Sequence, residues 1–401
     1  MGPKIVIACD SFKGCLGSGE VASAVAEGII KVMPDVETVI MEVADGGEGT
    51  GHILTGILGG KSVTTEVRDP LGRKIMAEYG ITSKASGQVA HTAIIEMAQA
   101  SGLTLLKEKE RNALQTSTYG TGEMILDAVN KGCRSILVGI GGSATNDGGT
   151  GMLEALGFIF KGADGTVIKG CSGERLAEIH DIDESSVPQE ILDSKFVVAC
   201  DVNTPFCGED GASRIFARQK GADDISIEIL EAGMQSLHKI IARKYGIELN
   251  SIPGSGAAGG LGGAFKAFLG AGLKSGIDMV LDAAGFDRMI ENASLVITGE
   301  GHIDSQSSRG KVIDGILERC RKKDVPVIAI GGIVDNHEMD RTDMNYTGRR
   351  HFFKTFQIGP RPENESDLEY AMRPEVARKN ISETVATALK ELSPSLFREI
   401  L

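Results

Sequence analysis

The sequence contains no tryptophan, and aromatic residues make up 4% of the chain. Proteins that stack nucleobases or enclose quaternary ammonium groups need aromatic faces, so this scarcity argues against both kinds of binding. Basic residues are also in deficit. Lys and Arg number 42 against 55 Asp and Glu, which gives a formal net charge of −13. We therefore expect no nucleic-acid partner that is held by a basic surface.

Long apolar runs are missing as well. No stretch approaches the roughly 18 consecutive apolar residues of a membrane-spanning helix, and the first residues lack the charged and apolar regions of a secretory signal. The seven cysteines are odd in number, scattered and without a CxxC pair, which argues against a disulfide framework or a zinc knuckle. We expect a reduced, cytoplasmic protein with no membrane partner.

Glycine, by contrast, is abundant at 53 of 401 residues, and hydrophobic residues make up 41% of the chain. At roughly 100–200 residues per domain, this length predicts two or three domains with large cores. Apolar strand patterns at 4–8 and 38–43 alternate with helical patterns at about 20–33 and near 52–58. Such alternation with short loops is typical of a parallel sheet with right-handed crossovers.

The alternation stops near residue 60. Two extended runs joined by Asp69-Pro-Leu-Gly72 predict an antiparallel hairpin, and strand–helix alternation returns at a strand predicted for 293–298. The expected fold is α/β, with a Rossmann-like parallel-sheet domain at 1–62 and 288–401. Residues 63–287 are expected to form a large inserted mixed α/β domain. A terminal helix is predicted at 382–391 with Ser382 as its N-cap.

Three predicted strand ends of the first domain carry polar or glycine-rich loops. These are Asp10-Ser-Phe-Lys-Gly14, Asp45-Gly-Gly-Glu-Gly49 and Gly299-Glu-Gly-His-Ile-Asp304. Because ligands of open parallel sheets bind at the carboxyl ends of the strands, the three loops are expected to converge. Together they supply a lysine, several carboxylates and backbone amides, which suit a phosphorylated ligand with a divalent metal. Each loop taken singly is also compatible with an ordinary tight connection.

The inserted domain has a glycine loop of its own, Gly139-Ile-Gly-Gly-Ser-Ala-Thr-Asn-Asp-Gly-Gly149. Its first residues match the dinucleotide pattern GxGxxA, and Asp164 follows at the distance of a ribose-binding carboxylate, but a phosphate cradle fits equally well. The segment 253–260 matches GxGxxG without a preceding strand, so close packing and anion binding both stay open. Asp201 follows another strand and is either a cap or a metal or base residue.

Taken together, the motifs resemble the type I glycerate kinase family over essentially the whole chain. The segments that carry the resemblance are Asp10-Ser-Phe-Lys-Gly14, Ala44-Asp-Gly-Gly-Glu-Gly-Thr50, Val67-Arg-Asp-Pro-Leu-Gly72, Ile95-Glu-Met-Ala98, Thr118-Tyr-Gly-Thr-Gly-Glu123, Gly141-Gly-Ser-Ala-Thr-Asn-Asp-Gly-Gly149, Cys200-Asp-Val202, Gln219-Lys-Gly-Ala222, Gly256-Ala-Ala-Gly-Gly-Leu-Gly262 and Ile297-Thr-Gly-Glu-Gly301 with Asp304. The chain departs from the family pattern at several positions, among them His302, where Arg is frequent.

The resemblance implies a kinase that transfers the γ-phosphoryl group of ATP to D-glycerate with Mg²⁺, in a cleft between the two domains. We expect catalytic roles for Lys13, Asp201 and Asp304. Substrate or phosphate contacts are expected from Asp10, Ser11, Asp45, Gly46, Gly47, Gly141, Gly142, Ser143, Asn146, Gly256, Gly299 and Gly301. The expected metal ligands are Asp45, Glu48 and Glu300.

Two other functions stay open on the sequence. An NAD-dependent oxidoreductase of a small hydroxy acid would use the GxGxxA loop, but it gives the acidic loops no role. A non-catalytic sugar-acid sensor would bind glycerate without transferring a group, and it predicts a lost catalytic residue. The pattern does not decide between the 2- and the 3-hydroxyl of glycerate as acceptor, and it leaves a homodimer as a possible assembly.

Overall fold

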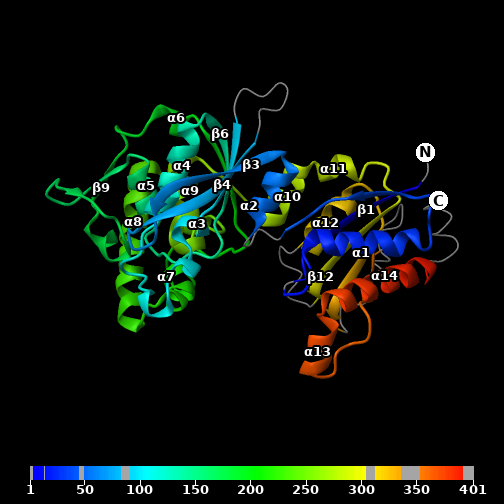
Figure 1. Ribbon diagram of the computed structural model, residues 1–401. Coiled ribbons are helices and arrows are strands. Elements are labelled where there is room, and N and C mark those ends of the chain that lie inside the picture. The colour runs from blue at the N-terminus through cyan, green and yellow to red at the C-terminus, as the bar shows by residue number, and fades with distance from the viewer. Residues whose placement is uncertain are drawn as a thin grey trace. The chain divides into compact units, whose positions relative to one another are not determined.

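The protein is described by a computed structural model that covers residues 3–12, 14–44, 49–82, 91–303, 312–335 and 353–391. Its contacts divide the chain into two units, Met1–Asp45 with Val280–Leu401, and Gly46–Met279. Figure 1 shows the elements of both units. Among the described helices, none has the length and hydropathy that a membrane span requires.

The first unit contains a parallel sheet in which the structure describes five strands, in the order β14-β13-β12-β1-β2. Its elements are β1 (Lys4–Cys9), α1 (Ser18–Ile30), β2 (Glu37–Ile40), α11 (Phe286–Met289), β12 (Leu295–Ile303), α12 (Val312–Lys322), β13 (Val327–Val334), β14 (Phe353–Gln357), α13 (Glu365–Ala371) and α14 (Pro374–Glu391). A further helix, α10 (Gly276–Ala284), crosses the boundary between the units.

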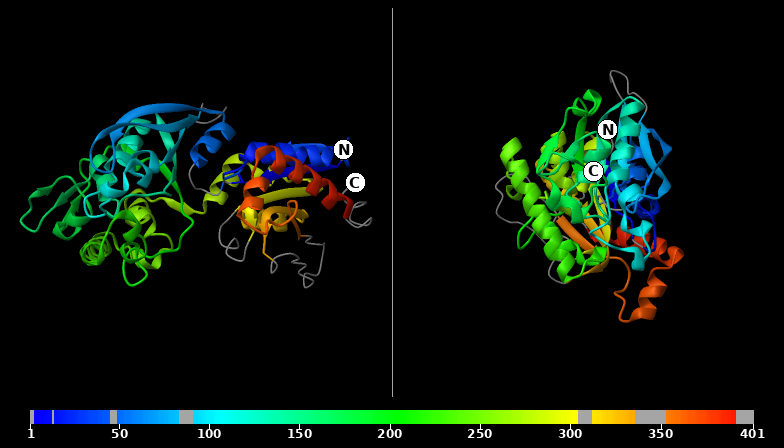
Figure 2. Two further views of the ribbon diagram at one scale, coloured as in Figure 1. Left: turned by 60° about the horizontal axis from the view of Figure 1, so that its bottom comes forward. Right: turned by 90° about the vertical axis from the view of Figure 1, so that its left-hand side faces the viewer.

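Helices cover both faces of this sheet because successive strand residues point to opposite sides. Ile328 and Ile330 of β13 belong to a core with α1 and α14. Ala329, between them, packs instead with Ile313 of α12. Helices α1 and α14, the blue and red helices of Figures 1 and 2, lie side by side. The predicted α/β fold with parallel crossovers is confirmed, and the carboxyl ends of neighbouring strands meet at one edge.

The second unit is built on a mixed sheet, described with six strands in the order β11-β10-β6-β5-β4-β3. The pairs β3–β4 and β4–β5 are antiparallel and the others parallel. The same unit contains a small antiparallel sheet with the strand order β8-β7-β9. The elements are α2 (Thr50–Ile57), β3 (Gly60–Arg68), β4 (Lys74–Thr82), β5 (His91–Glu96), α3 (Ala98–Ser101), α4 (Tyr119–Asn130), β6 (Cys133–Gly139), α5 (Thr150–Ala155), β7 (Ile159–Lys161), β8 (Val167–Ile168), β9 (Asp181–Asp183), α6 (Gln189–Leu192), β10 (Lys195–Ala199), α7 (Ala212–Phe216), α8 (Asp224–Tyr245), α9 (Ala257–Leu269) and β11 (Gly272–Lys274).

Three local expectations need correction. The strand predicted at 293–298 continues as β12 to Ile303, because Glu300 to Ile303 pair with β13, so 299–303 is strand rather than loop. Helix α14 begins at Pro374, a residue suited to a first helical turn, and Ser382 is a buried residue inside it. Helix α2 packs on β3, β4 and β5, so 50–57 belongs with the second unit and not with the Rossmann-like sheet.

Candidate active site

Two buried carboxylates lie at the edge of the first sheet. Asp10 directly follows β1, and Glu300 lies in the neighbouring parallel strand β12. The backbone N–H of Asp10 donates to the carbonyl of Gly299 at 2.9 Å, which ties the two positions together. The exposed fractions are 8% for Asp10 and 7% for Glu300. Both side chains line one cavity, as expected for the converging strand ends.

Backbone amides hold both carboxylates in place. Oδ1 of Asp10 accepts hydrogen bonds from the N–H of Ser11 at 2.7 Å and from its Oγ at 3.4 Å. Oε1 of Glu300 accepts from the N–H of Ile313 at 3.1 Å, in the first turn of α12. A carboxylate at a helix N-terminus is stabilised by the unpaired amides and the helix dipole. Two acidic groups with fixed orientations therefore lie in the same cavity.

The two glycines that flank Glu300 serve different purposes. A Cβ at Gly299 would lie 2.7 Å from the carbonyl oxygen of Ile330, so this glycine allows β12 and β13 to pack closely. A Cβ at Gly301 would meet nothing nearer than Cα of Phe12 at 3.8 Å, and Gly301 itself lines the cavity. Of the two, Gly301 is the one whose backbone is open to a ligand.

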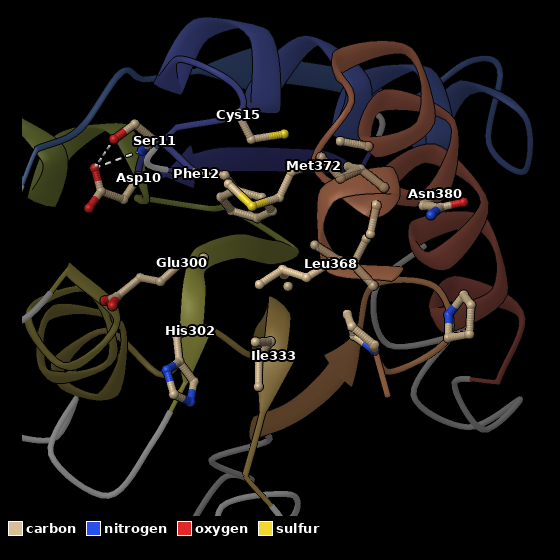
Figure 3. Close-up of a pocket in the computed structure, with 18 residues that line it drawn as sticks. Asp10, Ser11, Phe12, Cys15, Glu300, His302, Ile333, Leu368, Met372 and Asn380 are labelled. Atoms are coloured by element: carbon tan, nitrogen blue, oxygen red, sulfur yellow. Dashed lines mark hydrogen bonds between the residues drawn. The ribbon is translucent and has the colours of Figure 1, made fainter. Parts of the chain in front are cut away.

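The cavity has a volume of about 380 Å³ and changes character along its length. Figure 3 shows Asp10, Ser11, Glu300 and His302 towards one side and Leu368, Met372 and Asn380 towards the other. The latter three come from α13, α14 and the turn between them, and no sequence motif marks these residues as part of a site.

Among the cavity residues, His302 belongs to a chain of polar side chains. Its Nε2 lies 3.4 Å from Oδ2 of Asp335, whose Oδ1 accepts from Arg361 at 3.2 Å. His302, one of the departures from the family pattern, is therefore paired with a carboxylate that directly follows the neighbouring strand β13.

Several predicted site residues lie outside the described residues: Lys13, Asp45, Gly46, Gly47, Glu48 and Asp304. Two of the three expected metal ligands, Asp45 and Glu48, are among them. In the part of the chain that the structure describes, no group of three or more His, Cys, Asp or Glu side chains is arranged to hold a metal ion.

The second unit brings the glycine loop 139–149 against a buried lysine. Nζ of Lys220, whose side chain is 1% exposed, donates to Oγ of Ser143 at 2.6 Å and to the carbonyl of Thr145 at 2.7 Å. Burial lowers the pKa of Lys220 to about 7, while the nearby Asp147 carboxylate acts in the opposite direction. Lys220 lies in a segment that resembles the family, but no sequence pattern shows its burial.

The loop is folded around Asp147, which is completely buried. Its carboxylate accepts from the N–H and Oγ1 of Thr118 and from the N–H groups of Gly149 and Gly151. These bonds stabilise the ionised form, whereas burial raises the pKa of the Asp147 carboxyl. The buried carboxylate of Asp147, just before α5, therefore stabilises the conformation of the loop through these hydrogen bonds.

The outer part of the loop is accessible. Gly141 and Gly142 are exposed, and Gly142 has a φ of +72°, a conformation that favours glycine. Asn146 is buried and donates from Nδ2 to Oγ of Ser213 at 3.1 Å. The loop thus offers exposed backbone at one end, with Ser143 held by Lys220 behind it.

The two remaining predicted residues contact parts of the chain that are distant in sequence. Asp201 is exposed and accepts from the N–H of Gly276 at 2.8 Å, at the first residue of α10. Gly256 donates its N–H to the carbonyl of Thr204, and a Cβ there would lie 2.0 Å from the carbonyl oxygen of Pro205. Asp201 therefore caps a helix, and Gly256 allows close backbone packing.

The geometry of the loop 139–149 and of Asp164 does not match a dinucleotide-binding site. A Rossmann glycine turn leads directly into its helix, but α5 begins at Thr150, well after the GxGxxA residues. Asp164 lies in the turn between the antiparallel strands β7 and β8, where it accepts from the N–H and Oγ1 of Thr166. The acidic residue therefore stabilises a hairpin turn instead of following a second parallel strand.

The fold and site thus define an α/β protein of two units. In the first unit, a cavity lined by two carboxylates lies at the carboxyl ends of the strands of a parallel sheet. Residues 5–392 match the model of the glycerate kinase family, and the chain belongs to that family. This agrees with the resemblance found in the sequence.

Among curated relatives, the glycerate 2-kinase of Escherichia coli K12 is 44% identical over 344 residues, 84% of this chain and 89% of that protein. The glycerate kinase of Bacillus subtilis 168 is 41% identical over 331 residues, 82% and 85% of the two chains. A crystal structure from Salmonella typhimurium LT2, described as a glycerate kinase 2, superposes with a TM-score of 0.81 at 37% identity and covers 97% of both chains. These comparisons do not support the oxidoreductase and sensor alternatives.

Proposed function

We propose that this protein is a glycerate kinase that transfers the γ-phosphoryl group of ATP to D-glycerate, giving phosphoglycerate and ADP. The observation that carries the proposal is the pair Asp10 and Glu300. They are buried carboxylates on neighbouring parallel strands, lining one cavity, in a chain of the glycerate kinase family. Phosphoryl transfer needs charge stabilisation and positioning more than covalent chemistry from the protein, and carboxylates in this cavity would contribute to both by holding a divalent cation against the phosphates.

Mg²⁺ is the metal ion that we propose to accompany ATP. The donors present are of the right kind, since Mg²⁺ prefers oxygen ligands and binds through one or two carboxylates plus substrate phosphates. Glu300 would hold it together with Asp45 and Glu48. When bound, the ion would neutralise charge that develops on the phosphates.

The other predicted residues receive proposed roles on the same basis. Lys13 would neutralise the transferred group, and Asp304 would accept the hydroxyl proton, with Asp201 as the next candidate for that role. The amides around Asp10, Ser11, Gly46, Gly47 and Gly301 would bind substrate or phosphate. In the second unit, the exposed end of the loop at Gly141, Gly142 and Ser143 would bind an anion, supported by Asn146 and Lys220.

A reduced, cytoplasmic location is proposed with this function. It is supported by the cysteines, all seven of which lie in the described residues and are free thiols. D-glycerate and ATP are the proposed small-molecule partners, and a homodimer stays a prediction.

Phosphorus NMR of the product tests the function. Purified protein with ATP, Mg²⁺ and D-glycerate should form ADP and one phosphoglycerate isomer, and EDTA should stop the reaction. The spectrum also reports which hydroxyl is the acceptor. ADP formation that is indifferent to glycerate, or full turnover in metal-free buffer, would contradict the proposal.

A matched pair of variants links the activity to the cavity. Glu300→Gln keeps an oxygen for the N–H of Ile313 but removes the charge, and we expect turnover to fall about 10²–10³-fold. Glu318→Gln makes the same change on the exposed pair with Lys322 of α12 and should leave turnover unchanged. Equal activity of the two variants would remove Glu300 from the mechanism.

A further inference from the structure

The cavity of the first unit is larger and more apolar than glycerate requires. At about 380 Å³ it lies within the usual range of small-molecule sites, about 300–1,000 Å³. Glycerate is a three-carbon acid whose surface is a carboxylate and two hydroxyls, so it gains nothing from an apolar wall. Of the two proposed substrates, only ATP carries a heteroaromatic ring that such a wall would bury.

We infer that the apolar side of this cavity binds the nucleoside of ATP, with the triphosphate directed towards Asp10, Ser11 and Glu300. The inference rests on the proposed function and adds to it which unit and which residues hold the adenine. It follows from the distribution of side chains in the cavity.

The apolar wall is assembled from three parts of the chain. Phe12 comes from the loop after β1 and Ile333 from β13, whereas Leu368 and Met372 come from α13 and the residue that follows it. Ile381 of α14 also lines the cavity and is fully buried. Phe12 offers one aromatic face, and the aliphatic and thioether side chains beside it supply the further apolar contacts that a flat ring needs.

Asn380 of α14 supplies a polar group on the apolar side. It lines the cavity and is half-buried, and the structure records no hydrogen bond between its amide and another described residue. Gly359 lies against it, and a Cβ at that position would be 2.8 Å from Nδ2 of Asn380. A side-chain amide presents one donor and one acceptor side by side, which is the pattern that adenine offers on its N6 and ring-nitrogen edge.

The other side of the cavity suits phosphates. It is formed at the carboxyl ends of β1 and β12, where ligands of open parallel sheets bind. Gly301 and Gly332 line it without side chains, so a phosphate chain can approach the backbone closely. The carboxylates of Asp10 and Glu300 stand beside this path (Figure 3), where Glu300, the proposed metal ligand, can hold the divalent ion that accompanies ATP.

The test uses a variant whose larger side chain fills the apolar side of the cavity, and it measures the KM for ATP and the KM for D-glycerate separately. Leu368→Trp places a larger ring where the nucleoside would lie, and Leu192→Trp makes the same change at an exposed position of α6 in the second unit. We expect Leu368→Trp to raise the KM for ATP by about tenfold or more, with the KM for D-glycerate within about twofold of wild type. Leu192→Trp should change neither, and thermal melting should show both variants folded.

A second variant with a smaller change in side-chain volume, Asn380→Leu, keeps the inference testable if Leu368→Trp does not fold. Asn380→Leu should raise the KM for ATP about 3- to 10-fold, the effect of losing one neutral hydrogen bond. Calorimetry with adenosine in place of ATP should show binding to wild type and none to Leu368→Trp. Photolabelling with 8-azido-ATP should modify peptides from 353–391.

The outcomes separate this inference from the proposed function. An active wild type in which Leu368→Trp leaves the KM for ATP unchanged, or raises that for glycerate instead, would overturn the nucleoside site. A wild type that binds adenosine in a manner lost in Leu368→Trp, yet transfers no phosphoryl group to glycerate, would uphold the site and refute the function.

Discussion

Lys220 shows how strongly a single residue can depend on burial. Its ammonium group is enclosed by the glycine loop and contacts Ser143 and Thr145 through hydrogen bonds of 2.6 and 2.7 Å. Removing a charged amine from water disfavours the protonated form, and for this reason its pKa falls to about 7. The residue is thus poised between charge states near neutral pH.

This shift predicts a pH dependence of stability. Unfolded Lys220 has an ordinary pKa near 10.4, so between about pH 7 and 10 the unfolded chain binds a proton that the folded chain lacks. The free energy of unfolding therefore gains a contribution from Lys220 that rises with pH across this window, by at most about 1.4 kcal/mol per pH unit. Urea unfolding at pH 7 and pH 9 measures it.

Lys220→Met should remove this contribution, so that its unfolding free energy gains less between pH 7 and pH 9 than that of wild type. The exposed Lys195 of β10 offers the control, since Lys195→Met should keep the wild-type difference. Identical pH dependence in wild type and Lys220→Met would show that Lys220 stays charged in the folded protein.

At the residue scale, the sequence predicted the acidic positions better than their environment. Asp10 and Glu300 were predicted to converge because both follow parallel strand patterns, and the structure places both in one cavity. The sequence could not show that Asp201 caps α10 or that Gly256 packs against Pro205, because those partners are distant in sequence. Nor could it show that Lys220 is buried.

At the scale of elements, alternation of apolar residues predicted most strands and helices, but their ends depend on neighbours. β12 extends to Ile303 because β13 continues beside it as far as Val334. Helix α14 begins as early as Pro374. Polar residues such as Glu375 and Arg378 interrupt the apolar periodicity of its first turns, so the pattern does not predict this part of the helix. Helix α13 is similarly polar and begins after Asn364, whose side chain accepts from the N–H of Asp367 at 3.0 Å.

The packing of α1 against α14 gives a prediction for one glycine. A Cβ at Gly28 would lie 2.5 Å from the carbonyl oxygen of Ser382 and 2.9 Å from Cβ of Val385. Gly28→Ala should therefore separate the two helices, with an overpacking cost of about 1–3 kcal/mol that exceeds the gain in helix propensity of about 0.5–1 kcal/mol. Chemical denaturation should show a net loss of stability.

The control for Gly28 is Gly56 of α2, where a Cβ would meet no atom within 4 Å. Gly56→Ala should stabilise the protein by about 0.5–1 kcal/mol, since the alanine restricts the unfolded chain without a clash. A stabilising Gly28→Ala would mean that α1 and α14 are less closely packed than the structure indicates.

For the whole molecule, composition and alternation were enough to predict an interrupted α/β fold. The segment 46–62 was assigned to the first domain because its helix follows a strand–helix–strand pattern, but α2 packs on the sheet of the second unit. Local sequence carries no information on which of two sheets a short amphipathic helix will cover. The catalytic cleft between two domains stays a prediction.

Each unit has a hydrophobic core of its own, and this predicts how the chain folds. Most core residues between Val67 and Ala271 form one large cluster, and a second large cluster joins residues of β1, α1, β12, β13 and α14. A fragment of residues 46–285, which keeps α10 and its cap by Asp201 intact, should therefore fold alone and unfold cooperatively in urea. Residues 1–45 should not fold alone, because β1 depends on β12 for its hydrogen bonds and its core. Circular dichroism of the two fragments checks both expectations, and a fragment 46–285 without cooperative unfolding would show that its core needs the rest of the chain.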